Sequence, residues 1–340
     1  MIITKKDLIC VLNELLPLKS IDVNYPPVGL LYTIQLEEEC LVKPVSELSY
    51  DDQRKRFMKT KKVTEPLDSE VPNARDYRQC FYAAGLLEYE SKAELEDKIK
   101  EAAKRTVLNR NRPLFIGYDT DALRHRLNRL VESIISKYAA ESTMQIGFCI
   151  SERVISQLSK QWSPKYKQHE LPSQLNFSYN FLNQQPKDAR MARLGSIEHN
   201  RTAKFTLYSE AKENRIFNDS DDSIIKSYQD FASDYAVDIL LVTGDSDFAY
   251  KAETKRLNSH RMEYPDKIEN FKEYHAEWDT VTELIFCTAI IFGYIEMSYI
   301  KILGVWAGKD LDDWDSDNLK IEISDPELED KIKRHRSIIY

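Results

Sequence analysis

Residues Ile239–Phe248, ILLVTGDSDF, decide the fold class of this chain. Their first half, Ile239–Val242, is apolar, which is typical of a strand buried on both faces in a parallel sheet. Gly244 then permits a sharp turn, and Asp245 and Asp247 follow at once. Because ligands bind at the carboxyl ends of strands in open α/β sheets, this stretch predicts a strand that carries two carboxylates to such an edge.

A second stretch, Pro113–Leu123 (PLFIGYDTDAL), repeats this pattern. An apolar run, Leu114–Ile116, is followed by Asp119 and Asp121. Two acidic clusters at two strand ends favour a shared metal site over two unrelated functions. The alternative is that each Asp caps the helix that follows it, because Asp is a preferred N-cap residue.

Strand and helix patterns alternate from Leu114 onwards, so we expect an α/β fold with a parallel sheet flanked by helices over residues 106–258. Prolines and polar runs interrupt this alternation and predict an insertion at about 163–215. We interpret residues 1–105 as a mainly helical accessory domain. Residues 259–340 are expected to form a C-terminal helix-strand extension packed on the core.

Composition excludes several classes of function. The 340 residues carry a formal net charge of -8, so binding of nucleic acid would need local basic patches. Five cysteines without a CxxC pair indicate reduced core residues of a cytoplasmic protein. The histidines form no HExxH motif, which argues against zinc hydrolase chemistry. The most apolar run, Leu284–Ile295, is too short to span a bilayer, and we expect no membrane partner.

Four acidic clusters along the predicted sheet domain are candidate ligands for a divalent cation. Carboxylate oxygens suit Mg²⁺ or Mn²⁺, and such ions lower the pKa of a bound water and neutralise charge on a phosphodiester. The same acids at helix starts also fit capping and the helix dipole. The candidate metal ligands are Asp119, Asp121, Glu152, Asp221, Asp222, Asp245 and Asp247.

Three motifs in this order resemble the PIN-domain nucleases: DTDAL (Asp119–Leu123), DDSII (Asp221–Ile225) and VTGDSDF (Val242–Phe248). The resemblance covers about 114–160 and 215–255. It implies a PIN-like domain and a metal-dependent endonuclease that hydrolyses phosphodiester bonds, with RNA preferred over DNA. The implied cofactor is Mg²⁺ or Mn²⁺.

The resemblance also assigns roles. Asp119 takes the place of the first acid, Asp222 or Asp221 the third, and Asp245 the fourth, with Asp247 in support. The second acid of the family sits before a leucine inside a helix, and Gln157 holds that place here, before Leu158. Glu152, earlier in the same helix, is the available substitute. The implied catalytic residues are Asp119, Glu152, Asp222 and Asp245.

Two alternatives compete with the nuclease. The first is a non-catalytic PIN-like scaffold that binds RNA or a protein, which Gln157 in place of an acid favours. The second is a phosphatase similar to the haloacid dehalogenases, since Asp119-x-Asp121 and the GDSD run resemble motifs of that family. The Gly-Thr sequel to its DxD motif is missing here, so we rank this alternative lower.

Basic side chains flank the predicted site on both sides. They could hold phosphates around an acidic centre. For any single residue a solvated charged face is the better explanation, and only the clustering on both sides of the site favours contact. The expected partner is single-stranded or structured RNA, with DNA as an alternative and a homodimer left open. The candidate nucleic-acid contacts are Arg124, Arg126, Arg129, Arg190, Arg193, Arg201 and Lys204.

Overall fold

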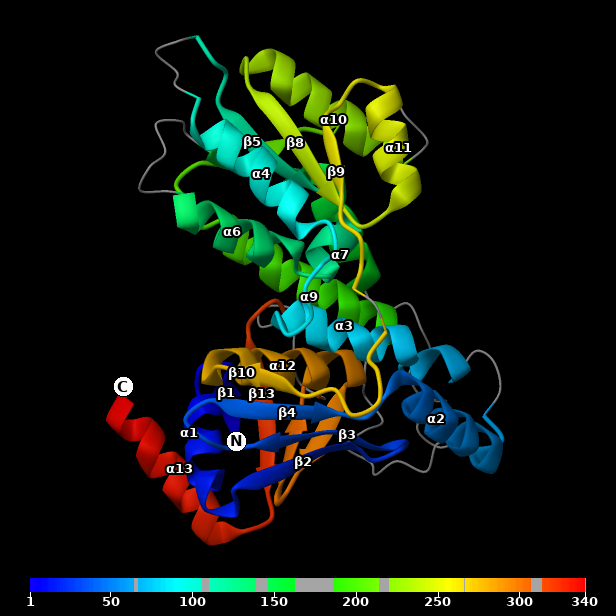
Figure 1. Cartoon of the computed structure of the whole chain (residues 1–340), viewed down its shortest axis with the longest axis vertical. Helices are drawn as coiled ribbons and strands as arrows, with labels where there is room; N and C mark the ends of the chain where they lie inside the picture. Colours follow the sequence, from blue (N-terminus) through cyan, green and yellow to red (C-terminus); the bar gives the residue numbers. More distant parts are fainter. Residues whose placement is uncertain are drawn as a thin grey trace. The chain divides into compact units, whose positions relative to one another are not determined.

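The computed structural model describes residues 1–63, 67–105, 110–138, 146–162, 186–213, 220–265, 267–306 and 314–339 (Figure 1). The chain divides into two units. We call Glu88–Ser163 with Ala192–Pro265 the parallel unit, and Met1–Leu87 with Pro164–Met191 and Asp266–Tyr340 the antiparallel unit. Each is described separately below.

The parallel unit is built on a five-stranded sheet in the order β7-β6-β5-β8-β9, and all of its pairings are parallel. The chain runs outward from β5 to β7 and then returns to place β8 on the other side of β5. The point of reversal lies between β5 and β8, where open α/β sheets bind their ligands. The strands are β5 (Leu114–Tyr118), β6 (Ile146–Ser151), β7 (Tyr208–Ala211), β8 (Asp238–Thr243) and β9 (Ser259–Arg261).

Helices flank this sheet, as the alternating sequence pattern predicted (Figure 1). Helix α10 packs on β6, β7 and β8, while α11 packs on β8 and β9. The α/β class and the parallel sheet are therefore confirmed. The helices of this unit are α4 (Lys92–Ala103), α5 (Thr120–Arg124), α6 (Leu127–Tyr138), α7 (Glu152–Trp162), the part of α9 (Lys187–Thr202) from Ala192 onward, α10 (Ser220–Asp234) and α11 (Ser246–Thr254).

Tyr228 of α10 fixes the carboxyl ends of β5 and β6. Its buried hydroxyl donates to the carbonyl oxygen of Tyr118 at 2.5 Å. It accepts hydrogen bonds from the amide nitrogens of Tyr118 at 3.1 Å and Ser151 at 3.2 Å. A Cβ on Gly117 would lie 3.0 Å from the Tyr228 ring, so glycine there leaves room for it. Tyr228 thereby holds the backbone just before Asp119.

The antiparallel unit contains an eight-stranded sheet in the order β1-β13-β12-β11-β2-β3-β4-β10, with every pairing antiparallel. Buried and more exposed residues alternate along β2 and β4, as expected when one face packs and the other meets solvent. The strands are β1 (Ile2–Thr4), β2 (Ser20–Tyr25), β3 (Gly29–Gln35), β4 (Cys40–Pro44), β10 (Tyr274–Ala276), β11 (Tyr294–Met297), β12 (Ile300–Leu303) and β13 (Asn318–Ile323).

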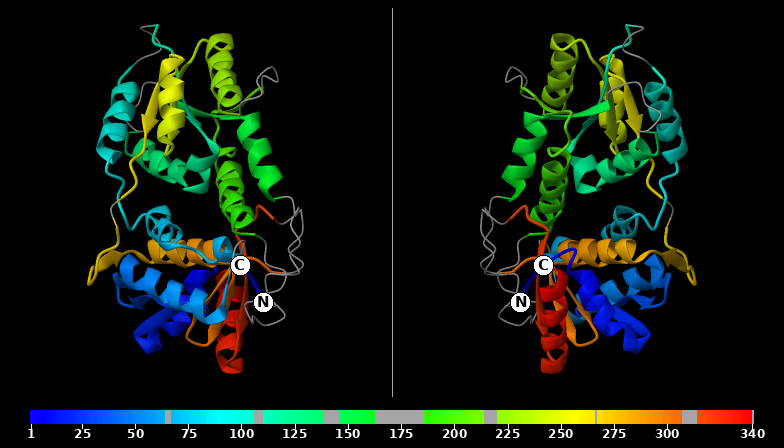
Figure 2. Two further views of the ribbon diagram at one scale, coloured as in Figure 1. Left: turned by 90° about the vertical axis from the view of Figure 1, so that its right-hand side faces the viewer. Right: turned by 90° about the vertical axis from the view of Figure 1, so that its left-hand side faces the viewer.

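Helix α12 forms the core of the antiparallel unit. It packs on α3 and on β4, β11 and β12, and its Thr288 hydroxyl accepts a buried hydrogen bond of 3.1 Å from Tyr32. Helix α13, red in Figure 2, packs on α1 and β13. In the described part of the chain, no helix is both long and apolar enough for a membrane crossing. The described helices of this unit, besides the first residues of α9, are α1 (Leu8–Leu15), η1 (Leu16–Leu18), α2 (Glu47–Lys61), η2 (Leu67–Glu70), α3 (Ala74–Ala84), α12 (Trp278–Phe292) and α13 (Pro326–Ile339).

The structure corrects the predicted domain boundaries. Residues 1–105 contain the predicted helices but do not form a separate domain, because β1, β2 and β4 pair with β13, β11 and β10 from the C-terminal part. Residues from Glu88 onward belong to the parallel unit. Within residues 259–340, β9 belongs to the parallel sheet, whereas β10 to β13 complete a second sheet. The predicted insertion at about 163–215 contains β7, a strand of the parallel sheet itself, while residues 163–185 lie outside the described part.

Candidate functional site

Asp119 links the ends of β5 and β8. It directly follows β5 and caps helix α5, because its Oδ1 accepts a hydrogen bond of 2.7 Å from the amide of Ala122. Its Oδ2 accepts one of 2.5 Å from the hydroxyl of Thr243, the last residue of β8. Asp119 is thus a helix cap and also a buried carboxyl group at the reversal point of the sheet.

Asp245 occupies the matching place after β8. It caps helix α11, with Oδ1 accepting hydrogen bonds from the amides of Asp247 at 2.8 Å and Phe248 at 3.1 Å. Its own amide donates to the Thr243 hydroxyl at 3.0 Å, so Thr243 joins Asp245 to Asp119. The side chains of Asp245 and Asp247 are exposed, unlike that of Asp119.

The carboxyl groups of this edge interact electrostatically. Burial first, and then the charges of Asp121 and Asp245, raise the pKa of Asp119 to about 7 against the opposing hydrogen bonds from Thr243 and Ala122. A buried acid surrounded by like charges is stabilised in its ionised form by a nearby cation. The edge is therefore electrostatically suited to bind one.

Asp121 has a different environment. Burial raises its pKa, but the charge of His125 and the hydrogen bonds from His125 and Tyr264 outweigh that effect and lower the pKa to about 2. Its Oδ2 lies 3.0 Å from His125 Nδ1 and accepts a hydrogen bond of 2.6 Å from the Tyr264 hydroxyl. A Cβ on Gly244 would lie 1.9 Å from that hydroxyl oxygen, so the glycine of the GDSD run is needed for the approach of Tyr264.

Gln157, which holds the place of the second acid in the resemblance to the PIN-domain nucleases, lies beside the residues that follow β5. The Gln157 side chain accepts a hydrogen bond from the hydroxyl of Thr120 and donates one to the hydroxyl of Ser220. Glu152 lies on the exposed first turn of α7, where its Oε2 accepts a hydrogen bond of 3.0 Å from the amide of Glu213. Glu213 follows β7, so this contact directs Glu152 toward the far side of β6 from β5.

Asp221 and Asp222 begin helix α10 and form ion pairs with α11. Asp221 Oδ2 lies 2.9 Å from the Lys251 ammonium, and Asp222 Oδ1 lies 2.7 Å from that of Lys255. Both carboxylates are partly exposed. Their described contacts therefore join two helices, whereas the contacts of Asp119 join two strand ends.

The donor set fits a hard cation in chemical type, because Asp119 and Asp245 offer carboxylate oxygens at adjacent strand ends. Among the described residues, however, no group of three or more His, Cys, Asp or Glu side chains is arranged to hold a metal ion. Asp121 already binds His125 and Tyr264. A bound Mg²⁺ or Mn²⁺ thus stays a proposal, with Asp119 and Asp245 as its principal ligands.

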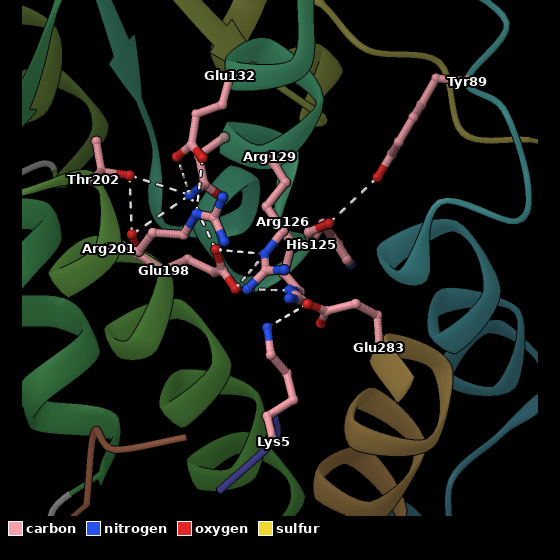
Figure 3. Close-up of polar contacts among 11 residues, drawn as sticks. Lys5, Tyr89, His125, Arg126, Arg129, Glu132, Glu198, Arg201, Thr202 and Glu283 are labelled. Atoms are coloured by element: carbon pink, nitrogen blue, oxygen red, sulfur yellow. Dashed lines mark hydrogen bonds and ion pairs between the residues drawn. The ribbon is translucent and has the colours of Figure 1, made fainter. Parts of the chain in front are cut away.

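A buried ion network between α6 and α9 contains several of the predicted phosphate contacts (Figure 3). Arg126 Nε donates to Glu198 Oε1 at 2.7 Å, and neither side chain is exposed. Arg129 Nε donates to the same carboxylate at 2.8 Å. Arg201 Nε donates to Glu132 Oε2 at 2.8 Å. This network holds two helices of the parallel unit together.

The structure corrects the predicted nucleic-acid contacts at three buried arginines. Arg126 is enclosed with Glu198, and Arg193 is fully buried. Arg190, in the antiparallel unit, donates to the carbonyl oxygens of Ile291 at 3.1 Å and Glu70 at 3.2 Å. Enclosed guanidinium groups offer no surface to a phosphate. The contacts that stay predictions are Arg124, Arg129, Arg201 and Lys204.

Thr243, His125 and Tyr264 were not among the predicted site residues. Thr243 ends the apolar run of the VTGDSDF motif, so its position at the strand end could have indicated it. His125 lies one helical turn after Asp121, a spacing that places two side chains on one face. Tyr264 follows β9 in an irregular segment, and no local pattern connects it with Asp121.

Comparisons with known proteins found no match for this chain among family models, curated proteins or solved structures. The geometry of the strand ends therefore carries the functional argument.

Proposed function

We propose that the parallel unit is a PIN-like, Mg²⁺- or Mn²⁺-dependent endonuclease that hydrolyses phosphodiester bonds, with RNA as the preferred substrate. The observation that supports this most is the Thr243 hydroxyl, which joins Asp119 and the amide of Asp245 at the reversal point of the sheet. The order of the DTDAL, DDSII and VTGDSDF motifs along the chain agrees with it.

Each residue of the edge has a defined task in this proposal. Asp119 and Asp245 would hold the cation, and the Thr243 hydroxyl orients the Oδ2 atom of Asp119. Tyr264 and His125 hold Asp121 in its ionised form beside them. When bound, the cation supplies a water of lowered pKa and neutralises charge on the phosphodiester.

A non-catalytic scaffold that binds RNA or a protein is the second candidate. Gln157 favours it, because an amide held by Thr120 and Ser220 brings no negative charge to the place of the second acid. The ion pairs of Asp221 and Asp222 with lysines favour it too. The phosphatase alternative has less support, since Asp119-x-Asp121 lacks the Gly-Thr sequel of that family's motif.

Cleavage of labelled single-stranded RNA by the full chain tests the proposal, with Mn²⁺ or Mg²⁺ present and EDTA as the metal-free control. Asp245→Asn keeps a good N-cap residue while removing one charge, so α11 should stay folded. We expect a rate loss of about 100-fold or more, the size of effect seen when one electrostatic group is removed from an active site.

Asp234→Asn is the matched control, because Asp234 is an exposed aspartate at the end of α10. It should cleave at the wild-type rate. Metal-independent cleavage, or full activity of Asp245→Asn, would refute the proposed site. Absence of cleavage on both RNA and DNA would favour the scaffold.

A further inference from the structure

A cavity of about 530 Å³ opens at the amino ends of β5 and β8. Leu114 and Asp238 are the first residues of these strands, so the cavity lies at the opposite end of the sheet from Asp119. The length of β5 separates the two places by about 15 Å. Pockets for small ligands have volumes of about 300–1,000 Å³, and this one falls within that range.

The rim of the cavity is basic. Lys98, Arg105, Arg112 and Arg256 line it, against the two acids Glu101 and Asp238. Arg105 lies 3.5 Å from Asp238 in an ion pair, and Lys98 donates to the carbonyl oxygen of Ser259 at 3.2 Å.

Arg112 and Arg256 give the rim its capacity for an anion. Both side chains are exposed, and among the described residues neither forms a salt bridge or a side-chain hydrogen bond. Two arginines on one cavity match a phosphate well, because a guanidinium can donate two parallel hydrogen bonds to its oxygens.

Arg256 has a left-handed backbone. It follows helix α11 with φ of 63°, the left-handed conformation that glycine normally supplies at this place. A side chain at this place is less favourable than glycine, which adopts a positive φ without steric cost. Other described residues, such as Lys62 after α2, share a positive φ, so a ligand is inferred from the cavity and its two arginines.

The floor of the cavity is apolar, with Leu114, Ile239, Leu240 and Leu257 among its lining residues. A purely inorganic anion would leave this surface uncovered. A ligand that combines a flat, weakly polar ring system with a phosphate would cover the floor and reach the rim together.

We propose that this cavity binds a nucleotide, with its base on the apolar floor and its phosphate between Arg112 and Arg256. A free mononucleotide and the 5′-phosphorylated end of an RNA strand present the same chemistry. The cavity is distinct from the acidic edge, and the binding needs no divalent cation.

Calorimetric titration of the full chain in EDTA tests this with four probes: AMP, GMP, unphosphorylated guanosine, and a 5′-phosphorylated RNA hexamer. We expect a Kd below about 1 mM for a mononucleotide or for the phosphorylated hexamer. Guanosine should bind at least tenfold more weakly than GMP. The response of the mononucleotides and of the hexamer tells which source of phosphate the cavity accepts.

Arg112→Ala and Arg256→Gly should each weaken this binding at least tenfold, while Arg256→Gly also removes the backbone strain. Arg261→Ala is the matched control, since this exposed arginine lies at the other end of β9. Asp245→Asn should bind normally, which separates this inference from the nuclease proposal. Failure of all four probes to bind, equal binding of guanosine and GMP, or unchanged affinity in both arginine variants would overturn it.

Discussion

Strands β5 and β8 are followed by Asp119 and Asp245 at their carboxyl ends, whereas Arg112 and Arg256 line the cavity at their amino ends. The orientation of the helices accounts for part of this difference in charge. A parallel α/β sheet gathers helix N-termini at its carboxyl edge and helix C-termini at its amino edge, and the helix dipole favours acids at the first and bases at the second.

Each end of the sheet has a feature that the helix dipole does not explain. At the carboxyl edge, Asp119 is a cap, but a surface cap would need neither burial nor a second hydrogen bond from another strand. At the amino edge, Arg256 suits the dipole but not its backbone conformation. Opposite charges at the two ends are therefore expected of the fold, and the proposals of a cation and of a nucleotide rest on what the dipole does not explain.

The largest effect on stability is expected away from both ends of the sheet, in the ion network between α6 and α9. Glu198→Gln leaves the enclosed guanidinium of Arg126 without a counter-charge, which should lower the free energy of unfolding by about 3–5 kcal/mol. Chemical denaturation measures it. Glu96→Gln removes the same charge from an exposed pair with Lys137 and should change the midpoint little. If both substitutions changed the free energy of unfolding equally little, the buried pair of Arg126 and Glu198 would not stabilise the fold.

Asp119→Asn should give the next largest effect, and it depends on pH. The pKa of Asp119 is raised from 3.8 to about 7 in the folded protein. The folded state therefore holds the proton more tightly, and its stability falls as pH rises from about 4 to 7. The variant lacks this loss and should be more stable at pH 8 by on the order of 4 kcal/mol, with no gain at pH 4.

Thermal unfolding of the variant and the wild type in EDTA at pH 4 and pH 8 measures this difference. Comparing the two proteins at each pH cancels the contribution of other titrating groups, such as His260. Parallel pH profiles for Asp119→Asn and the wild type would show that Asp119 is an ordinary cap. The electrostatic contrast between the two ends of the sheet would then reduce to the helix dipole.

Gly244→Ala tests the packing of the carboxyl edge. Its new Cβ would lie 1.9 Å from the Tyr264 hydroxyl oxygen, so Tyr264 must move away from Asp121. We expect a destabilisation of about 1–3 kcal/mol, the range for overpacking of a tight site. In combination with Tyr264→Ala, which removes the clash, the cost of the alanine should disappear. Strictly additive effects of the two changes would argue against direct contact.

Arg256→Gly should have the smallest effect on stability, at the amino edge. Glycine relieves the left-handed backbone but increases the freedom of the unfolded chain, so the free energy of unfolding should rise by less than about 1 kcal/mol. Thermal denaturation measures it. A clear loss of stability would mean that the Arg256 side chain supports the fold, and the inferred role in phosphate binding would lose its basis.

The parallel unit was largely predictable from sequence because its signals are local. The apolar runs before Asp119 and Asp245 correspond to β5 and β8, which are buried on both faces. The antiparallel unit was missed because its N-terminal and C-terminal strands are joined by pairings across the length of the chain: β1 with β13, β2 with β11 and β4 with β10. A strand as short as β7, Tyr208–Ala211, carries too few residues to show a period.

The site was predictable only in part, for a similar reason. Motif positions indicated Asp119 and Asp245, because caps follow strands in sequence. The partners that set the chemistry come from elsewhere: Tyr264 reaches Asp121 from beyond β9, and Glu198 encloses Arg126 from α9. Burial of a charged side chain depends on tertiary contacts, which is why Arg126, Arg190 and Arg193 were misassigned to nucleic acid.

Binding of Mn²⁺ to the metal-free full chain, followed by electron paramagnetic resonance, tests the central claim most directly. The account predicts saturable binding with a Kd below about 1 mM, weakened at least tenfold in Asp119→Asn and unchanged in Asp234→Asn. No binding in this range, or equal affinity in Asp119→Asn and the wild type, would contradict a cation site at the carboxyl edge.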